Sequence, residues 1–164
     1  MGIKNIKKCE IENSNPSHDE FYIRKSMDYQ KLLPLFKDAG LEVELDEPDP
    51  RGLLMCFEVV DKNSNEIIGA SSIINNNGIY QVKTLAVAKE YQGRGIGRYL
   101  MDKMVDVLRN LGAKKVILNA KEPGFYERVG FTESSIDTKD IEYDCGDCEH
   151  FNRDCFPKIM EREI

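Results

Sequence analysis

Three glycines stand close together in the stretch YQGRGIGRYLMDKM, residues 91–104. Gly93, Gly95 and Gly97 come directly before a helical pattern, where a glycine costs about 1 kcal/mol relative to alanine. A helix N-terminus leaves backbone N–H groups unpaired and carries a partial positive charge, so it binds anions. Glycine lets a phosphate come close to that backbone because it has no Cβ. The spacing predicts a phosphate-binding loop, with tight helix–sheet packing as the alternative role of the glycines.

Two common phosphate-binding loops do not match this stretch. A P-loop needs Lys followed by Ser or Thr after its last glycine, but Arg98 and Tyr99 stand there. A dinucleotide-binding fingerprint needs G-x-G-x-x-G and an acidic residue about 20 positions later. Here the glycines alternate with single residues, and the next apolar segment, KKVILNA, contains no acid.

A second group of reactive side chains lies near the C-terminus, in CGDCEHFNRDCFP. Three sulfurs and one imidazole complete a tetrahedral zinc site, and Cys-x-x-Cys is a common half of one. The other half is irregular, because the histidine follows the second cysteine by only two residues. Zinc binding, free thiols or small apolar side chains, and a redox or acceptor-contacting role all stay open. The residues of this predicted metal site are Cys145, Cys148, His150 and Cys155.

The apolar pattern predicts the elements that must position these groups. A helix over 29–40 should be kinked or split by Pro34 and end at Gly40. The long helix that begins at Ile96 should end at Gly112. Strands followed by strand–helix–strand–helix–strand indicate a mixed α/β fold with a mostly antiparallel sheet. The expected strands are 21–27, 53–61, 66–74, 79–87, 114–120, 131–137 and 157–164, and a short helix is expected at 123–130.

The strand at 79–87 contains an irregularity. Tyr80 and Val82 define one alternating face, but Leu85 and Val87 have the opposite parity. A β-bulge at position 83 or 84 would bring all four side chains to one side of the sheet, and bulges often lie beside active sites.

Length, composition and charge exclude several classes. The 164 residues suit one domain spanning 1–164, with a Cys-rich loop at 144–156 before the last strand. The formal net charge of −6 disfavours a nucleic-acid partner. No apolar run approaches the roughly 20 residues of a membrane span, and the first residues contain no signal-peptide core. Five cysteines without an export signal predict reduced thiols and a cytoplasmic protein.

Two motifs together resemble the GNAT superfamily of acetyl-CoA-dependent N-acetyltransferases. Gln92-x-x-Gly95-x-Gly97 follows the strand TLAV, as the family's Q/R-x-x-G-x-G/A signature does, and GFYERVGF at 124–131 is similar to the family's next helix and turn. The resemblance covers about 110 residues, from 21 to 131, and implies the GNAT acyl-CoA N-acyltransferase fold. It also implies direct acetyl transfer from acetyl-CoA to a primary amine of a small molecule or peptide, in a ternary complex.

The resemblance assigns residues to the coenzyme A site. The pyrophosphate is expected on the N–H groups of the glycine-rich loop, and the pantetheine arm is expected to pair with the backbone of the preceding strand. The predicted bulge agrees with this picture, because GNAT folds use one on this strand to splay the sheet. Asn119 matches a family asparagine that precedes the tyrosine of the next helix. The predicted cofactor-binding residues are Leu85, Ala86, Val87, Gln92, Gly93, Arg94, Gly95, Ile96, Gly97, Arg98 and Asn119.

For catalysis, Tyr126 matches the family's frequent general acid, which protonates the leaving thiolate. The alternative is a packed core tyrosine. Many relatives place a glutamate base four residues before the position of Leu85, but this chain has Gln81 there. Glutamine accepts no proton, although it can hold a water. The sequence therefore names no general base.

The resemblance places the acceptor between two segments, the connection after the first helices and the Cys-rich connection before the last strand. The first segment contains Glu44, Asp46, Glu47 and Asp49, which suits a cationic amine, although a solvated acidic loop is the alternative. A non-catalytic acyl-CoA-binding module, or a metal or redox sensor, is the alternative function. A monomer or a homodimer is expected.

Overall fold

The computed structural model describes residues 19–143, 145 and 148–164. These residues form a seven-stranded sheet in the order β1-β2-β3-β4-β5-β7-β6, in which only the β4–β5 pair is parallel. This is the mixed, mostly antiparallel architecture that the sequence predicts. The elements in chain order are β1 (Phe21–Ser26), η1 (Gln30–Leu32), α2 (Leu33–Asp38), β2 (Leu53–Asp61), β3 (Ile67–Asn76), β4 (Ile79–Val87), η2 (Lys89–Tyr91), α3 (Ile96–Asn110), β5 (Lys115–Ala120), α4 (Pro123–Arg128), β6 (Thr132–Glu133), η3 (Thr138–Asp140) and β7 (Lys158–Glu163).

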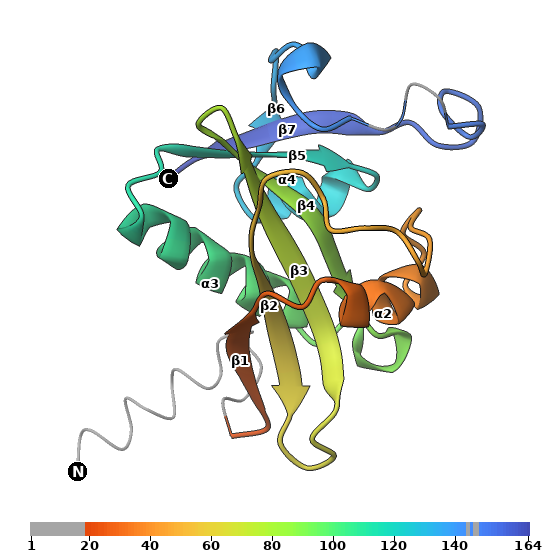
Figure 1. Cartoon of the computed structure of the whole chain (residues 1–164), viewed down its shortest axis with the longest axis vertical. Coiled ribbons are helices and arrows are strands. Elements are labelled where there is room, and N and C mark those ends of the chain that lie inside the picture. The colour runs from red at the N-terminus through yellow and green to blue at the C-terminus, as the bar shows by residue number, and fades with distance from the viewer. Residues whose placement is uncertain (1–18, 144, 146–147) are drawn as a thin grey trace.

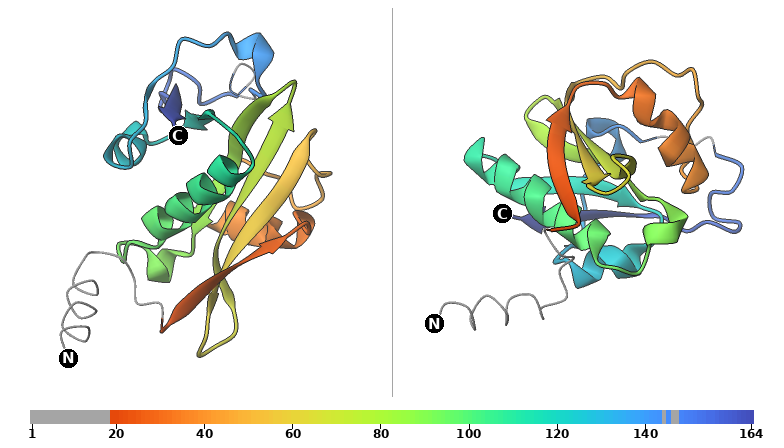
Figure 2. Two further views of the ribbon diagram at one scale, coloured as in Figure 1. Left: turned by 90° about the vertical axis from the view of Figure 1, so that its left-hand side faces the viewer. Right: turned by 90° about the horizontal axis from the view of Figure 1, so that it is seen from below.

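Helices cover both faces of the sheet, with α3 on one face and α2 on the other (Figures 1 and 2). Successive residues of β2 point to opposite faces, so Phe57 is buried in the cluster beneath α3, whereas Cys56 is buried in the cluster beneath α2. The buried residues of α3 recur at intervals of three or four, which is the pattern of an amphipathic helix on a sheet. β4 contributes to both clusters, with Val82 in the one beneath α3 and Ala86 in the one beneath α2.

The predicted bulge is confirmed in β4. Thr84 is opposite Ser72 and Val82 is opposite Ile73, so Lys83 is the extra residue. The hydroxyls of Ser72 and Thr84 lie 2.6 Å apart in the buried interior and join the two strands beside the bulge. The bulge changes the direction of β4 just before its last residues, where the chemistry is expected.

The parallel contact between β4 and β5 is short. Its register contains two pairs, Gln81 with Ile117 and Val82 with Leu118. Beyond them the two strands separate (Figure 1).

Two predicted elements differ in detail. The first helix is split as expected, because Pro34 lies in the first turn of α2 and a short 3-10 helix precedes it. The strand expected at 131–137 is only Thr132–Glu133. The chain leaves the sheet at Ser134, whose hydroxyl accepts from the N–H of Ile136 and donates to Glu161. This local turn competes with further pairing to β7.

Candidate active site

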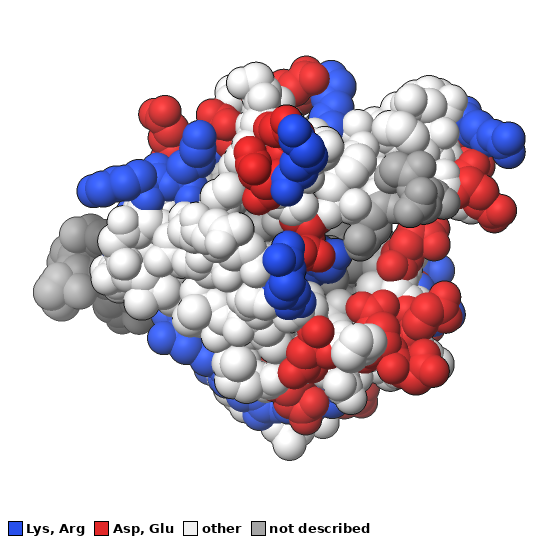
Figure 3. Space-filling model, turned by 45° about the horizontal axis from the view of Figure 1, so that its top comes forward, with Lys and Arg blue, Asp and Glu red and all other residues white. Residues whose placement is uncertain are grey.

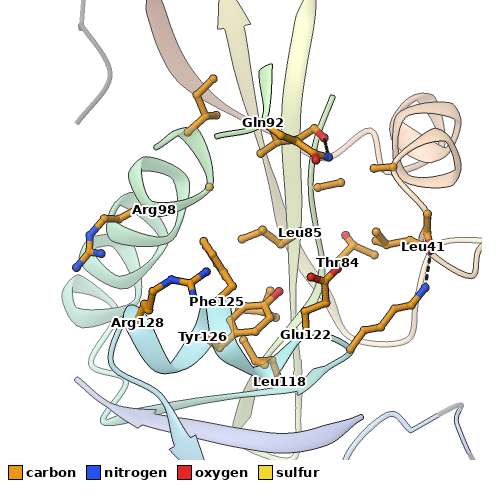
Figure 4. Close-up of a pocket in the computed structure, with 18 of the residues that line it drawn as sticks. Leu41, Thr84, Leu85, Gln92, Arg98, Leu118, Glu122, Phe125, Tyr126 and Arg128 are labelled. Carbon is orange, nitrogen blue, oxygen red and sulfur yellow. Dashed lines mark hydrogen bonds between the residues drawn. The ribbon is translucent and has the colours of Figure 1, made fainter. Parts of the chain in front are cut away.

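A cavity of about 670 Å³ lies where β4 and β5 separate. The end of β4, the glycine-rich loop, the first turn of α3 and the helix α4 form its walls (Figure 4). Every residue of the predicted coenzyme A site except Arg94 lines it. The structure therefore brings together residues 85–87, 92–93, 95–98 and 119 of the predicted site.

The glycine-rich loop presents backbone N–H groups to this cavity. Gly93 and Gly95 both have φ of +81°, a left-handed conformation that a residue with a Cβ rarely adopts. Gly95 is the N-cap of α3, and no side chain among the described residues caps the helix. The first turn also contains no acidic residue. The partial positive charge of the helix end is therefore available to an anion.

Gln92 fixes the loop to the strand. Its side-chain Nε2 donates to the carbonyl of Val87, the last residue of β4, at 2.9 Å. The Gln92 side-chain amide thus bridges the end of the strand and the start of the loop. Leu85 and Val87 pair with β3 on one side, at Ser71 and Gly69. On the other side, the described β5 residues pair only with positions 81 and 82.

Arg94 lies outside the cavity lining because it stacks on Tyr91, with its guanidinium carbon 4.9 Å from the ring centroid. The Tyr91 hydroxyl donates to Asp61 at 2.8 Å. This hydrogen bond lowers the pKa of Asp61 and raises the pKa of Tyr91. The contacts connect the loop to the end of β2. Arg98 from α3 and Arg128 from α4 also line the cavity and lie on the same side of it in Figure 4.

Tyr126 points its hydroxyl into the cavity (Figure 4). Its ring packs edge-on against Phe125 and Phe131, with centroids 5.0 Å and 5.8 Å away. Burial, and the nearby carboxylate of Glu122, raise the pKa of the Tyr126 phenol to about 12. The phenol is thus a proton donor throughout the neutral range. The ring is thus packed as a core tyrosine would be, while its hydroxyl faces the cavity.

A second cavity of about 410 Å³ adjoins the first. The two share six lining residues, and the ε-amino group of Lys121 donates across the gap to the carbonyl of Gly40 at 3.2 Å. The second cavity lies between the α2–β2 connection and the Cys-rich segment, the two regions predicted to hold an acceptor. The shared residues are Leu41, Val82, Lys83, Thr84, Asn119 and Lys121.

Acidic side chains gather on the side of the molecule that carries the α2–β2 connection (Figure 3). Of the four acids predicted there, only Glu47 lines the second cavity. Its two carboxylate oxygens accept from the N–H of Glu44 and from the hydroxyl of Tyr29. Glu42, which the sequence analysis did not single out, lines the cavity as well.

The predicted zinc site is not supported. Among residues 19–143, 145 and 148–164, no group of three or more His, Cys, Asp or Glu side chains is placed to hold a metal ion. His150 Nδ1 instead lies 3.0 Å from Asp154, and Cys145 Sγ lies 2.9 Å from Nδ2 of Asn119. The cysteines that the structure describes are thiols, and Cys145, Cys148 and Cys155 line the second cavity. Backbone hydrogen bonds to the carbonyl of His150, from the N–H groups of Arg153 and Cys155, hold this segment in a tight turn.

Asn119 stands at the boundary of the two cavities. Its Oδ1 atom is buried without a hydrogen-bond partner among the described residues. An unpaired buried acceptor costs roughly 1–3 kcal/mol, so such an atom is typical of a site that completes its bonds with a ligand.

Gln81 stands where many members of the family that the sequence resembles have a glutamate. The residue is 3% exposed, and its side chain is hydrogen-bonded to Glu142, which is distant in the sequence. Its Nε2 donates to the carbonyl of Glu142 at 2.9 Å, and its Oε1 accepts from the N–H of Glu142 at 3.1 Å. Both ends of the amide are therefore used, and the glutamine does not need a water to satisfy it.

Comparison with known proteins identifies the family. The model of the acetyltransferase (GNAT) family matches residues 9–131, most of the chain. This chain belongs to the GNAT acetyltransferase family. The glycine-rich loop and Tyr126 both fall within the matched segment.

Several proteins are similar to this GNAT chain in sequence. N-alpha-acetyltransferase 30 of Schizosaccharomyces pombe is 33% identical over 87 residues, which cover 46% of this chain and 57% of that protein. An uncharacterized N-acetyltransferase of Chlorobaculum tepidum is 33% identical over 70 residues, 42% of this chain and 45% of that protein. The chain thus spans about half the length of these curated relatives.

Solved structures confirm the GNAT fold. A GNAT acetyltransferase from Staphylococcus aureus Mu50 superposes with a TM-score of 0.66 at 18% identity, covering 87% of this chain and 98% of that one. The PaiA N-acetyltransferase of Thermoplasma acidophilum, solved in complex with coenzyme A, gives 0.61 at 16% identity, covering 88% and 99%. No helix in the described part of the GNAT chain is both long and apolar enough to cross a membrane.

Several cavity residues were not predicted from the sequence, among them Lys121, Glu122, Phe125 and Arg128. Lys121 and Glu122 lie in the connection between β5 and α4, and Phe125 and Arg128 belong to α4. One signal pointed to them: Glu122, Phe125 and Tyr126 are separated by helical intervals, so they share one side of a short helix. Arg128 gave no such signal.

Proposed function

We propose that this chain transfers an acetyl group from acetyl-CoA to a primary amine in a ternary complex. One observation supports the proposal above all others: the cavity between β4 and β5 combines an uncapped helix N-terminus with the hydroxyl of Tyr126. An anion-binding end and a proton donor in one cavity suit a ligand with a pyrophosphate at one end and a thioester at the other.

The residues present fit acetyl-CoA. The N–H groups of Gly95, Ile96 and Gly97 would hold the pyrophosphate, with Arg98 and Arg128 supplying positive charge. The backbone of Leu85–Val87 would pair with the amides of the pantetheine arm, because its β5-facing side has no strand partner among the described pairs. Bound in this way, acetyl-CoA supplies an activated acyl group.

Tyr126 would donate its proton to the sulfur of the leaving thiolate. The raised pKa of about 12 keeps the phenol protonated until that step. The second cavity would hold the amine, because it shares lining residues with the first cavity and is lined by several carboxylates. A cationic small molecule or a peptide amine is the acceptor class that this lining favours.

The test combines binding with turnover. Calorimetry should give a Kd for coenzyme A, and acetyl-CoA should release free thiol in the presence of an amine panel: spermidine, free amino acids, an aminoglycoside and a lysine-bearing peptide. No coenzyme A binding would refute the site, and binding without thiol release for any amine would refute the transfer.

The alternative is a non-catalytic acyl-CoA-binding module. Gln81 is the observation in its favour, because an amide cannot serve as the base at that position. Such a module would bind coenzyme A and release no thiol, so the same experiment separates the two functions.

A further inference from the structure

The contact between Gln81 and Glu142 joins residues 61 positions apart in the chain. The amide of Gln81 donates one hydrogen bond to the Glu142 backbone and accepts another from it. An ionised glutamate at position 81 could form only one of the two, because a carboxylate has no proton to donate. The glutamine is therefore matched to this partner and is not simply a lost base.

The contact with Gln81 determines where the Glu142 carboxylate lies. Glu142 lines the second cavity, and its side chain is 24% exposed. Gln81 forms one of the two β4–β5 pairs beyond which the strands separate. Glu142 is thus attached to β4 next to Val82, which lines both cavities. Because Gln81 and Glu142 are 61 positions apart, local sequence patterns do not indicate this contact.

Arg51 fixes the carboxylate from the other side. Its Nε and Nη2 atoms lie 3.0 Å and 2.7 Å from Oε1 of Glu142. No described residue bonds the other oxygen, Oε2. The backbone of Glu142 is therefore held by β4 and one oxygen by Arg51, while the second oxygen can receive a ligand.

We propose that Glu142 binds the ammonium group of the acceptor and takes up one of its protons, and that Gln81 is the residue that positions it. The inference rests on the proposed acetyl transfer. Two other carboxylates of this cavity are already engaged: Glu47 accepts two hydrogen bonds, and Asp154 pairs with His150. Glu42 is exposed on the α2–β2 connection and has no bond to β4 among the described contacts.

The ammonium group gives one proton to Glu142, which later releases it to solvent, and the free amine attacks the acetyl carbon. The C–N bond forms, the C–S bond breaks, and Tyr126 protonates the sulfur. The second proton of the attacking nitrogen restores the Tyr126 hydroxyl. Ammonium and thioester thus give amide, free thiol and one proton, with no other reactant.

The first test is Glu142→Gln with the panel amine of highest kcat/KM. The KM for that amine should rise at least tenfold, about 1.4 kcal/mol, while the Kd for acetyl-CoA stays within twofold. Glu142→Asp should recover part of the loss. Hydroxylamine, which is uncharged at neutral pH, should lose far less rate than the ammonium substrate. Glu44→Gln is the matched control, since Glu44 is an exposed acid of the α2–β2 connection that lines neither cavity.

The second test is Gln81→Glu. A glutamate would lose the donated hydrogen bond and bring negative charge to the carbonyl of Glu142, so kcat/KM for the amine should fall at least tenfold with unchanged acetyl-CoA binding. Activity equal to or higher than that of the wild type would overturn the positioning role, because the two hydrogen bonds of Gln81 to Glu142 would then not be needed for activity. An unchanged amine KM in Glu142→Gln would overturn the inference but leave the acetyl transfer intact. A wild-type protein that binds acetyl-CoA and acetylates no amine would overturn both.

Discussion

Replacing Tyr126 by phenylalanine removes one hydroxyl and little else. The ring contacts with Phe125 and Phe131 stay, and the hydroxyl has no hydrogen-bond partner among the described residues, so the free energy of unfolding should change by less than about 1 kcal/mol. A general acid contributes about 10²–10⁴ in rate, which corresponds to roughly 2.7–5.4 kcal/mol of transition-state stabilisation. Turnover should fall by that factor, while the calorimetric Kd for acetyl-CoA stays unchanged.

The assay for this variant is thiol release under saturating acetyl-CoA, with Tyr22→Phe on β1 as the control that should keep wild-type turnover. An acetyl donor whose leaving group needs no proton, p-nitrophenyl acetate, should lose far less rate in Tyr126→Phe than acetyl-CoA does. The wild-type rate should show no alkaline decrease from this phenol below about pH 11, because its pKa is raised to about 12. A Tyr126→Phe protein with half or more of the wild-type turnover would refute the general-acid role.

Three further outcomes follow from the contacts. Gly95→Glu should weaken coenzyme A binding at least tenfold, about 1.4 kcal/mol, in calorimetry, whereas Gly78→Glu, with a similar positive φ in an open turn, should leave the Kd unchanged. Gly97→Ala should keep the wild-type melting temperature, since alanine gains about 1 kcal/mol over glycine in a helix. The same variant should lose several-fold affinity for coenzyme A, because the new Cβ would lie 3.2 Å from Phe125. An unchanged affinity for coenzyme A would contradict a tight cavity wall. Burial acts to raise the pKa of Glu58, but hydrogen bonds from cationic neighbours outweigh it and lower the pKa. The stabilisation from Glu58 is therefore present above its unfolded pKa and is lost as pH falls through the folded pKa. In denaturant titrations, Glu58→Gln should flatten the loss of stability below about pH 4, and an acid slope identical to that of the wild type would disprove the linkage.

Local pattern was enough to predict much of this fold. The change of parity between Val82 and Leu85 located the bulge, because alternation in a strand is a strict geometric rule. The glycine spacing located the uncapped start of α3 for a similar reason, since only glycine adopts the required φ without strain. Such features depend on neighbours in the chain.

Features that depend on tertiary contact were not predictable in this way. Zinc binding, one of the three roles left open for the Cys-rich segment, is not supported among the described residues, and residue types alone do not reveal that His150 turns back to Asp154. The partner of Gln81 lies 61 residues away, and no periodicity connects the two positions. Arg128 lies at the end of α4 and lines the cavity through the tertiary placement of that helix, which no single segment of the sequence indicates.

The short seam between β4 and β5 has a consequence for the lifetime of the protein. Two residue pairs join the β1–β4 part of the described sheet to the β5–β7 part, so the backbone of Leu85–Val87 lacks the protection that a full strand partner would give. A donor molecule that binds there as an extra strand would close the seam. Ligand binding at a concentration of 100 Kd adds about 2.7 kcal/mol to the free energy of unfolding. For a chain that binds acetyl-CoA in this way, resistance to proteolysis would then rise and fall with the cellular supply of its own substrate.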